Sequence, residues 1–269
     1  MTPRPAANAI HHLRPVYWLF LWAHVLTGYF LAAGTRGLEG ANLLRGLVAG
    51  GMWAVLLGGP AIGLATLFGV ARPPDNVPRI AALGWTAVIL MLAGMVLSPM
   101  VGWEFFDAYL IGMILAVAHT VPPVRLGRIT AVGILCRAVG VGALTLFSGY
   151  AAAGVGLARA AVALWPLGLF FFLAIAVGAL TSRRKSRALP VGFILALSAA
   201  IACGVFFARE IGVHWYGILL GLPPLAAWAI LGLARFMGTG RSAEPPSLFL
   251  CATAWFLSDV CLVLTGMVG

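Results

Sequence analysis

Long apolar stretches separated by short polar breaks form the main pattern of this 269-residue chain. A membrane-spanning helix needs about 20 predominantly apolar residues. Helices are predicted rather than open strands, because every backbone N–H must be paired inside a hydrocarbon layer. The short connections predict one all-α transmembrane domain over residues 1–269, a polytopic bundle of nine transmembrane helices. We place the helices at residues 16–33, 46–70, 80–99, 106–121, 129–150, 160–181, 191–208, 214–234 and 247–267.

The amino-acid composition agrees with this pattern. Hydrophobic residues make up 62% of the chain and charged residues only 9%, whereas a soluble domain carries about 25% charged residues. The composition therefore predicts an integral membrane protein. A proline-rich polar segment without a small-residue cleavage site precedes the first apolar stretch, so we expect that stretch to remain as the first helix. We expect a multi-pass protein of a bacterial-type inner or plasma membrane.

The positive charges lie mostly on one predicted side of the membrane, which sets the orientation. With nine spans, the N-terminus and every second loop share a side that holds twelve basic residues, against four on the other side. The positive-inside rule therefore predicts a cytoplasmic N-terminus and a C-terminus outside. The net charge of +10 follows from this asymmetry, so it does not imply a nucleic-acid partner.

The cytoplasmic arginines and the lysine allow two interpretations. The simpler one is that they only set the topology. The alternative is that basic side chains meet at the mouth of the bundle and bind a phosphate, a diphosphate or an anionic lipid head group. The candidate anion-binding and head-group-binding residues are Arg72, Arg79, Arg125, Arg128, Arg183, Arg184, Lys185 and Arg187.

A few polar side chains fall inside the apolar stretches, where they are expensive and usually pair or line a polar cavity. Arg137 and Asp259 either pair with each other or reach water near the interface. His24 in the first predicted helix either binds the metal of a pigment or heme, or hydrogen-bonds a neighbouring helix, which is the commoner role. His119 lies at the end of the fourth predicted helix.

The four cysteines show no spacing of a disulfide framework or a metal site. They lie in or beside apolar stretches, as small buried hydrophobic residues do. They are Cys136, Cys203, Cys251 and Cys261. We therefore predict no metal site from them.

Residues 119–128 read H-T-V-P-P-V-R-L-G-R, with two prolines that end an apolar stretch and two arginines that follow. This turn resembles the Y-S-x-P-P-L-R-L-K turn after the fourth helix of UbiA-type intramembrane prenyltransferases. His119 stands at the tyrosine position, Arg125 at the arginine, and Gly127 at the lysine with Arg128 next to it. The first helix, L-R-P-V-Y-W-L-F-L-W-A-H-V-L-T-G-Y-F-L-A at 13–32, is similar to the opening helix of that family.

The resemblance implies a nine-helix UbiA-like bundle and a specific chemistry. Members of that family bind an isoprenyl diphosphate through magnesium ions held by two cytoplasmic aspartate-rich motifs, and transfer the isoprenyl group to an acceptor. This sequence departs from the family at both motifs. Residues 65–80 contain one aspartate, Asp75, and residues 178–191 contain no acidic residue. Magnesium requires hard oxygen ligands, so we expect no bound metal, no cofactor and no catalytic residue.

We therefore expect an inactive relative that binds a lipid, a quinone or a pigment, or that serves as a subunit of a larger membrane complex. One alternative is an active prenyltransferase that transfers an isoprenyl group from a diphosphate to an aromatic or tetrapyrrole acceptor, and Mg²⁺ would be a cofactor only in that case. In this alternative, arginines neutralise the diphosphate. Another alternative is a transporter or channel, which the absence of a visible internal repeat disfavours.

Overall fold

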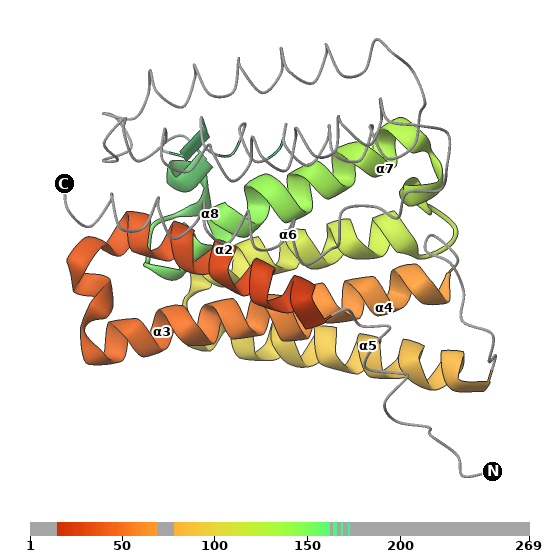
Figure 1. Cartoon of the computed structure of the whole chain (residues 1–269), viewed down its shortest axis with the longest axis horizontal. Helices are drawn as coiled ribbons and strands as arrows, with labels where there is room; N and C mark the ends of the chain where they lie inside the picture. The colour runs from red at the N-terminus through yellow and green to blue at the C-terminus, as the bar shows by residue number, and fades with distance from the viewer. Residues whose placement is uncertain (1–14, 69–77, 162–163, 166–167, 169–171, 173–269) are drawn as a thin grey trace, which may run out of the picture.

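The computed structural model describes residues 15–68, 78–161, 164–165, 168 and 172. In these residues all regular structure is helical and no strand occurs. Long helices run side by side in an elongated bundle (Figure 1). The elements are α2 (Pro15–Ala33), η1 (Gly34–Leu38), α3 (Gly40–Gly51), η2 (Met52–Gly58), α4 (Gly59–Leu67), α5 (Pro78–Leu97), η3 (Ser98–Met100), α6 (Trp103–Thr120), η4 (Leu126–Arg128), α7 (Thr130–Arg137), η5 (Ala138–Leu144) and α8 (Thr145–Ala152).

Two of the long helices contain a π-helical segment. The elements α3, η2 and α4 follow one another without a break, and so do α7, η5 and α8. Both η2 and η5 are π-helical and seven residues long. π turns inside α-helices are rare and often lie at functional sites.

Three described stretches are long and apolar enough to cross a membrane. They are Trp18–Leu38, Gly40–Ala65 and Ala131–Ala152, of 21, 26 and 22 residues. The predicted membrane association is therefore supported by apolar helices of the required length. Predicted helices 191–208, 214–234 and 247–267 and most of 160–181 lie outside the described residues.

The first five predicted helices coincide with observed helices, but the starts of two were wrong, and the second ends at Leu67 rather than at residue 70. The second helix begins at Gly40 rather than at residue 46. The charge of Arg45 does not end this helix, because its Nε donates a hydrogen bond of 2.8 Å to the carbonyl oxygen of Val101. The fourth helix begins at Trp103 rather than at 106, with Glu104 in its first turn. A carboxylate in that position interacts favourably with the helix dipole.

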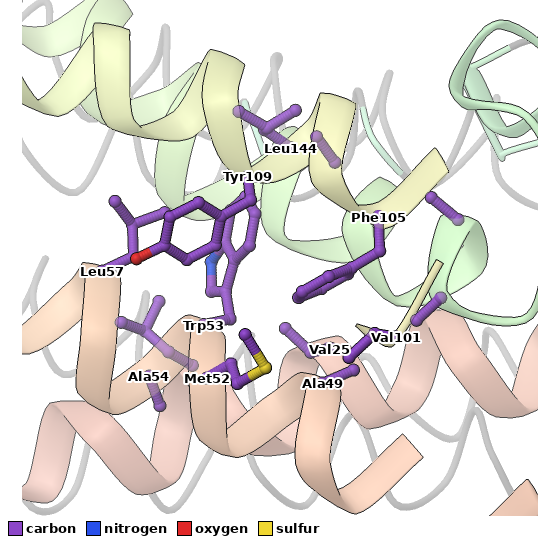
Figure 2. Close-up of a cluster of buried hydrophobic side chains, with 14 of the residues drawn as sticks. Val25, Ala49, Met52, Trp53, Ala54, Leu57, Val101, Phe105, Tyr109 and Leu144 are labelled. Carbon is purple, nitrogen blue, oxygen red and sulfur yellow. The ribbon is translucent and has the colours of Figure 1, made fainter. Parts of the chain in front are cut away.

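An aromatic cluster joins η2 to α6 in the core. Trp53 meets both Phe105 and Tyr109 edge-on, with 6.2 Å between ring centroids in each pair. Figure 2 shows these rings among the side chains of Met52, Leu57 and Leu144. All three rings are buried, and edge-on aromatic pairs contribute about 0.5–1.5 kcal/mol beyond their burial.

Helices α2 and α8 pack with their backbones in direct contact. A Cβ atom at Gly28 would collide with the carbonyl oxygen of Leu146, and one at Gly149 with that of Val25. Small residues permit this close approach, which is typical of helix pairs in membranes. The first predicted helix (α2) and the fifth (α7, η5 and α8) are therefore fixed against each other.

Two side-chain contacts show which connections meet at each end of the bundle. The Arg45 hydrogen bond joins α3 to the connection between η3 and α6. At the other end, the Arg125 guanidinium carbon lies 5.8 Å from the centroid of the Phe68 ring. The turn between α6 and α7 therefore lies beside the end of α4, as expected for helices that alternate in direction.

Candidate functional site

The turn between α6 and α7 is the candidate site. Helix α6 ends at Thr120, and Val121 is extended, with φ −90° and ψ 137°. Proline lacks an N–H and disfavours the helical region for the preceding residue, so Pro122 ends the helix here. The Pro122–Pro123 peptide bond is cis. The Arg125 N–H then donates a hydrogen bond of 3.1 Å to the carbonyl of Val121, which closes the turn.

Arg125 has an unusual backbone and a half-buried side chain. Its φ of 40° and ψ of 48° lie in the left-handed region, which costs a non-glycine residue about 1–2 kcal/mol. Its guanidinium lies over the Phe68 ring. The Nε atom is buried and has no hydrogen-bond partner among the described residues. The turn therefore presents a charged donor from a fixed position.

Trp18 of α2 is a second buried donor in the described bundle, beside the start of α4 rather than its end. Its indole lies against Gly59, where a Cβ would be 3.0 Å from the ring. Gly59 begins α4, and Phe68 follows the end of that helix. The Nε1 atom of Trp18 is buried with no hydrogen-bond partner in the described part of the chain. A buried donor left without an acceptor costs about 1–3 kcal/mol, so each such atom calls for an explanation.

The other residues of the turn face different surroundings. His119 and Thr120 are buried, and the Thr120 hydroxyl donates a hydrogen bond of 2.7 Å to the Ala116 carbonyl. Arg128 is exposed, whereas Gly127 is buried. Of the two predicted arginines, the structure therefore places Arg125 partly inside the bundle and Arg128 at its surface.

Most of the other predicted anion-binding residues are not placed. Arg79 lies in the first turn of α5. Arg137 is the last residue of α7 and is exposed, and the predicted Arg137–Asp259 pair stays a prediction. The residues outside the described ranges are Arg72, Arg183, Arg184, Lys185, Arg187 and Asp259.

His24 hydrogen-bonds a neighbouring helix. This histidine is fully buried, and its Nε2 atom lies 2.9 Å from the carbonyl oxygen of Gly142. Because a carbonyl only accepts, Nε2 carries the proton and donates. The predicted hydrogen bond is confirmed, and this ring nitrogen is not available to a metal while the bond is intact.

Side-chain donors reach carbonyl oxygens of both π-helical segments. The Trp53 N–H donates to the Thr145 hydroxyl at 3.1 Å, and that hydroxyl donates to the Gly140 carbonyl at 2.8 Å. The Tyr109 hydroxyl lies 2.9 Å from the carbonyl oxygen of Leu56. In a π turn the backbone bond shifts from i+4 to i+5, which alters the regular ladder. These bonds join η2 to α6 and α8, and α8 to η5, within the core.

The structure identifies one residue of the site that sequence reasoning missed, Phe68. It has no charge and lies at an apolar helix end, so no motif marks it. Only its position beside Arg125 shows its connection with the turn. Comparison of the chain with known protein families, curated proteins and solved structures finds no match.

Proposed function

We propose that the chain is a multi-pass membrane protein with a UbiA-like bundle of nine helices that is catalytically inactive. It binds a membrane lipid, an isoprenoid quinone or a pigment at the cytoplasmic end of the bundle. It does so alone or as a subunit of a larger membrane complex. The three apolar helices of spanning length support the membrane part of this proposal.

The half-buried guanidinium of Arg125 is the observation that carries the binding proposal. A left-handed backbone holds it, Phe68 covers it, and its buried Nε has no acceptor in the described residues. Phosphate and carboxylate oxygens are the acceptors that a guanidinium prefers. A ligand with such oxygens, or with quinone or pigment carbonyls, would supply what the turn lacks.

The residues in the two loops that correspond to the family's metal-binding motifs argue against catalysis by a metal. Prenyl transfer that depends on Mg²⁺ requires carboxylates on the cytoplasmic loops to hold the metal. One of the two segments offers only Asp75, and the other has no acid and four basic residues at 183–187. A group of cations repels Mg²⁺ and attracts anions. The composition of these loops therefore favours head-group binding over turnover.

The test compares the lipids that co-purify with three variants of the full chain in mild detergent. Arg125→Gln removes the charge and the fork of donors, and we expect about a tenfold loss of the bound molecule, since a charge-assisted hydrogen bond contributes about 1.5–3 kcal/mol. Arg128→Gln should have a smaller effect, because this residue is exposed. Arg36→Gln, exposed in η1, is the matched control and should change nothing. Mass spectrometry identifies and quantifies the bound molecule.

Two results would contradict the proposal. Equal lipid content in all three variants and the parent chain would leave the turn as a topological stop only. Magnesium-dependent prenyl transfer by the purified chain, lost in Asp75→Ala, would replace the inactive protein with the active prenyltransferase.

A further inference from the structure

Helix α5 has two faces of different composition. Its buried face presents small residues and one methionine. Apart from the exposed Thr86, its outer face consists of large apolar side chains at helical spacing. The buried residues are Gly84, Ala87, Met91 and Gly94 of α5 and Ser98 of η3. The large apolar outer residues are Trp85 at 71% exposure, Ile89 at 62%, Leu92 at 47% and Val96 at 70% on α5, and Met100 at 82% on η3.

Aromatic residues lie at both ends of this outer face. Trp85 is near the start of α5, and Trp103, 70% exposed, follows at the start of α6. From Trp85 to Met100 the helix covers about 24 Å, at 1.5 Å per α-helical and 2.0 Å per 3₁₀ residue. A hydrocarbon layer is about 30 Å thick, and tryptophan is enriched at its two edges.

Charged residues occur just beyond each tryptophan. Arg79 lies in the first turn of α5, six positions before Trp85. At the other end, Glu104 directly follows Trp103. Between Val88 and Met100, every exposed side chain is apolar.

We infer that this outer face of α5 contacts the acyl chains of a phospholipid bilayer, with Trp85 and Trp103 at the two edges of the hydrocarbon layer. The inference rests on the proposed membrane function. Helix α5 with η3 is not among the three apolar stretches of spanning length, because its described apolar part covers only Gly84–Met100. The inference therefore adds a fourth crossing to those three. In Figure 1, α5 forms the lower edge of the described bundle.

The distribution of small residues decides between lipid and a second protein. Helix pairs in membranes meet through small residues that let the backbones approach. From Ala87 onward, the small residues of α5 lie on the buried face, as Ala87 and Gly94 do, or are half-buried, as Ala93 is. A protein interface also carries about one hydrogen bond per 100–200 Å². From Val88 to Met100 the outer face has no exposed polar side chain to make one.

The experiment places the purified full chain in phosphatidylcholine–phosphatidylglycerol vesicles that contain a phospholipid with a diazirine in mid-chain. After irradiation and proteolysis, mass spectrometry maps the cross-linked residues. We expect adducts on Ile89, Leu92 and Val96. The buried neighbours Ala87 and Met91 should carry none.

Other patterns of adducts are equally informative. Adducts on exposed residues of other helices, such as Leu135 of α7, without any on α5, would overturn the inference and leave the membrane proposal intact. In that case protein covers the face. A chain with no adducts on any helix would instead contradict the membrane proposal itself.

A pair of exposed positions tests where the hydrocarbon layer ends. Leu92→Lys places a charge near the centre of the layer, and Trp103→Lys places one at its edge. Both positions are exposed and contribute little core packing, so the two variants differ mainly in the depth of the charge. A lysine at the centre of a spanning helix is costly, and the cost falls toward the interface. We expect about tenfold less inserted Leu92→Lys protein and near-parent levels of Trp103→Lys. Equal levels of the two variants would contradict the proposed edge.

Discussion

Arg125 combines a strained backbone with a side chain placed for binding. Its left-handed conformation is tolerated because two backbone hydrogen bonds hold the turn: the Arg125 N–H donates to the Val121 carbonyl, and the Arg128 N–H donates to the Arg125 carbonyl. Strain of about 1–3 kcal/mol at a single residue persists only where the surrounding structure fixes it, and such residues are concentrated at functional sites. The backbone and the guanidinium can therefore be tested separately.

We predict that Arg125→Gly is more stable than Arg125→Gln by about 1 kcal/mol, although both variants lose the bound ligand. Glycine removes the left-handed penalty, whereas glutamine keeps it. Denaturant unfolding in detergent measures the difference. Equal stability of the two variants would show that Arg125 is not strained in the folded protein.

We predict that His24→Leu lowers the free energy of unfolding by about 1–3 kcal/mol, because the Gly142 carbonyl loses a buried donor. His24→Gln is the matched variant, since a glutamine amide can donate from nearly the same position as Nε2. It should recover part of the loss. Thermal unfolding of both variants checks this, and identical losses would mean that ring packing rather than the hydrogen bond matters.

Some of these residues were predictable and others were not. A histidine inside an apolar helix needs a polar partner, so the hydrogen bond of His24 followed from its position. Its partner was not predictable, because Gly142 lies 118 residues away. Phe68 gave no signal at all, since apolar residues at helix ends are common in any membrane protein.

At the level of helices, the apolar pattern predicted the described elements well and their ends less well. The start of the second helix was displaced because Arg45 was taken to lie in a loop, whereas its side chain reaches the Val101 carbonyl. A pattern of apolar residues does not reveal such a bond between distant residues. The π-helical segments were also missed, because they depend on backbone register rather than on residue type.

We predict that Gly28→Ala and Gly149→Ala each destabilise the bundle by about 1–3 kcal/mol, because the added methyl group forces α2 and α8 apart. Gly51→Ala is the control, since a Cβ there meets nothing within 4 Å. It should be neutral or stabilising by up to about 1 kcal/mol. Unfolding in detergent compares the three variants. A loss in Gly51→Ala equal to the others would remove the packing explanation.

For the whole molecule, the orientation in the membrane is the most direct consequence of the charge pattern. Twelve basic residues on one predicted side favour a cytoplasmic position for the turn of Arg125. The structure places this turn beside Phe68 and places Arg36 in η1, after the first described helix. We therefore expect the two exposed positions Arg128 and Arg36 to report on opposite sides of the membrane.

We predict that a membrane-impermeant maleimide labels Arg128→Cys only in inside-out vesicles and Arg36→Cys only in intact cells. Both variants are made in a background without the four native cysteines. Mass-tag gel shifts measure the labelling. The reverse pattern would invert the orientation, and labelling of both positions from one side would contradict a spanning α2.

The sequence predicted the class of the molecule better than its site. Composition and run length are sums over many residues, so they predict a helical membrane protein without knowledge of any contact. The site depends on which turns meet, and the Arg125–Phe68 contact joins residues 57 positions apart (125 − 68 = 57). The family resemblance rests on two short stretches, 13–32 and 119–128, and stays a prediction.

The π-helical segments have a consequence for how the chain tolerates changes in length. A π turn holds one more residue than an α turn between hydrogen-bonded partners. Deleting one residue from η5 would let the segment return to α-helical register, while α7 and α8 keep their neighbours on either side. The same deletion in the middle of α6 would rotate everything beyond it by about 100°. Related sequences that are one residue shorter should therefore have their alignment gaps at 52–58 or 138–144.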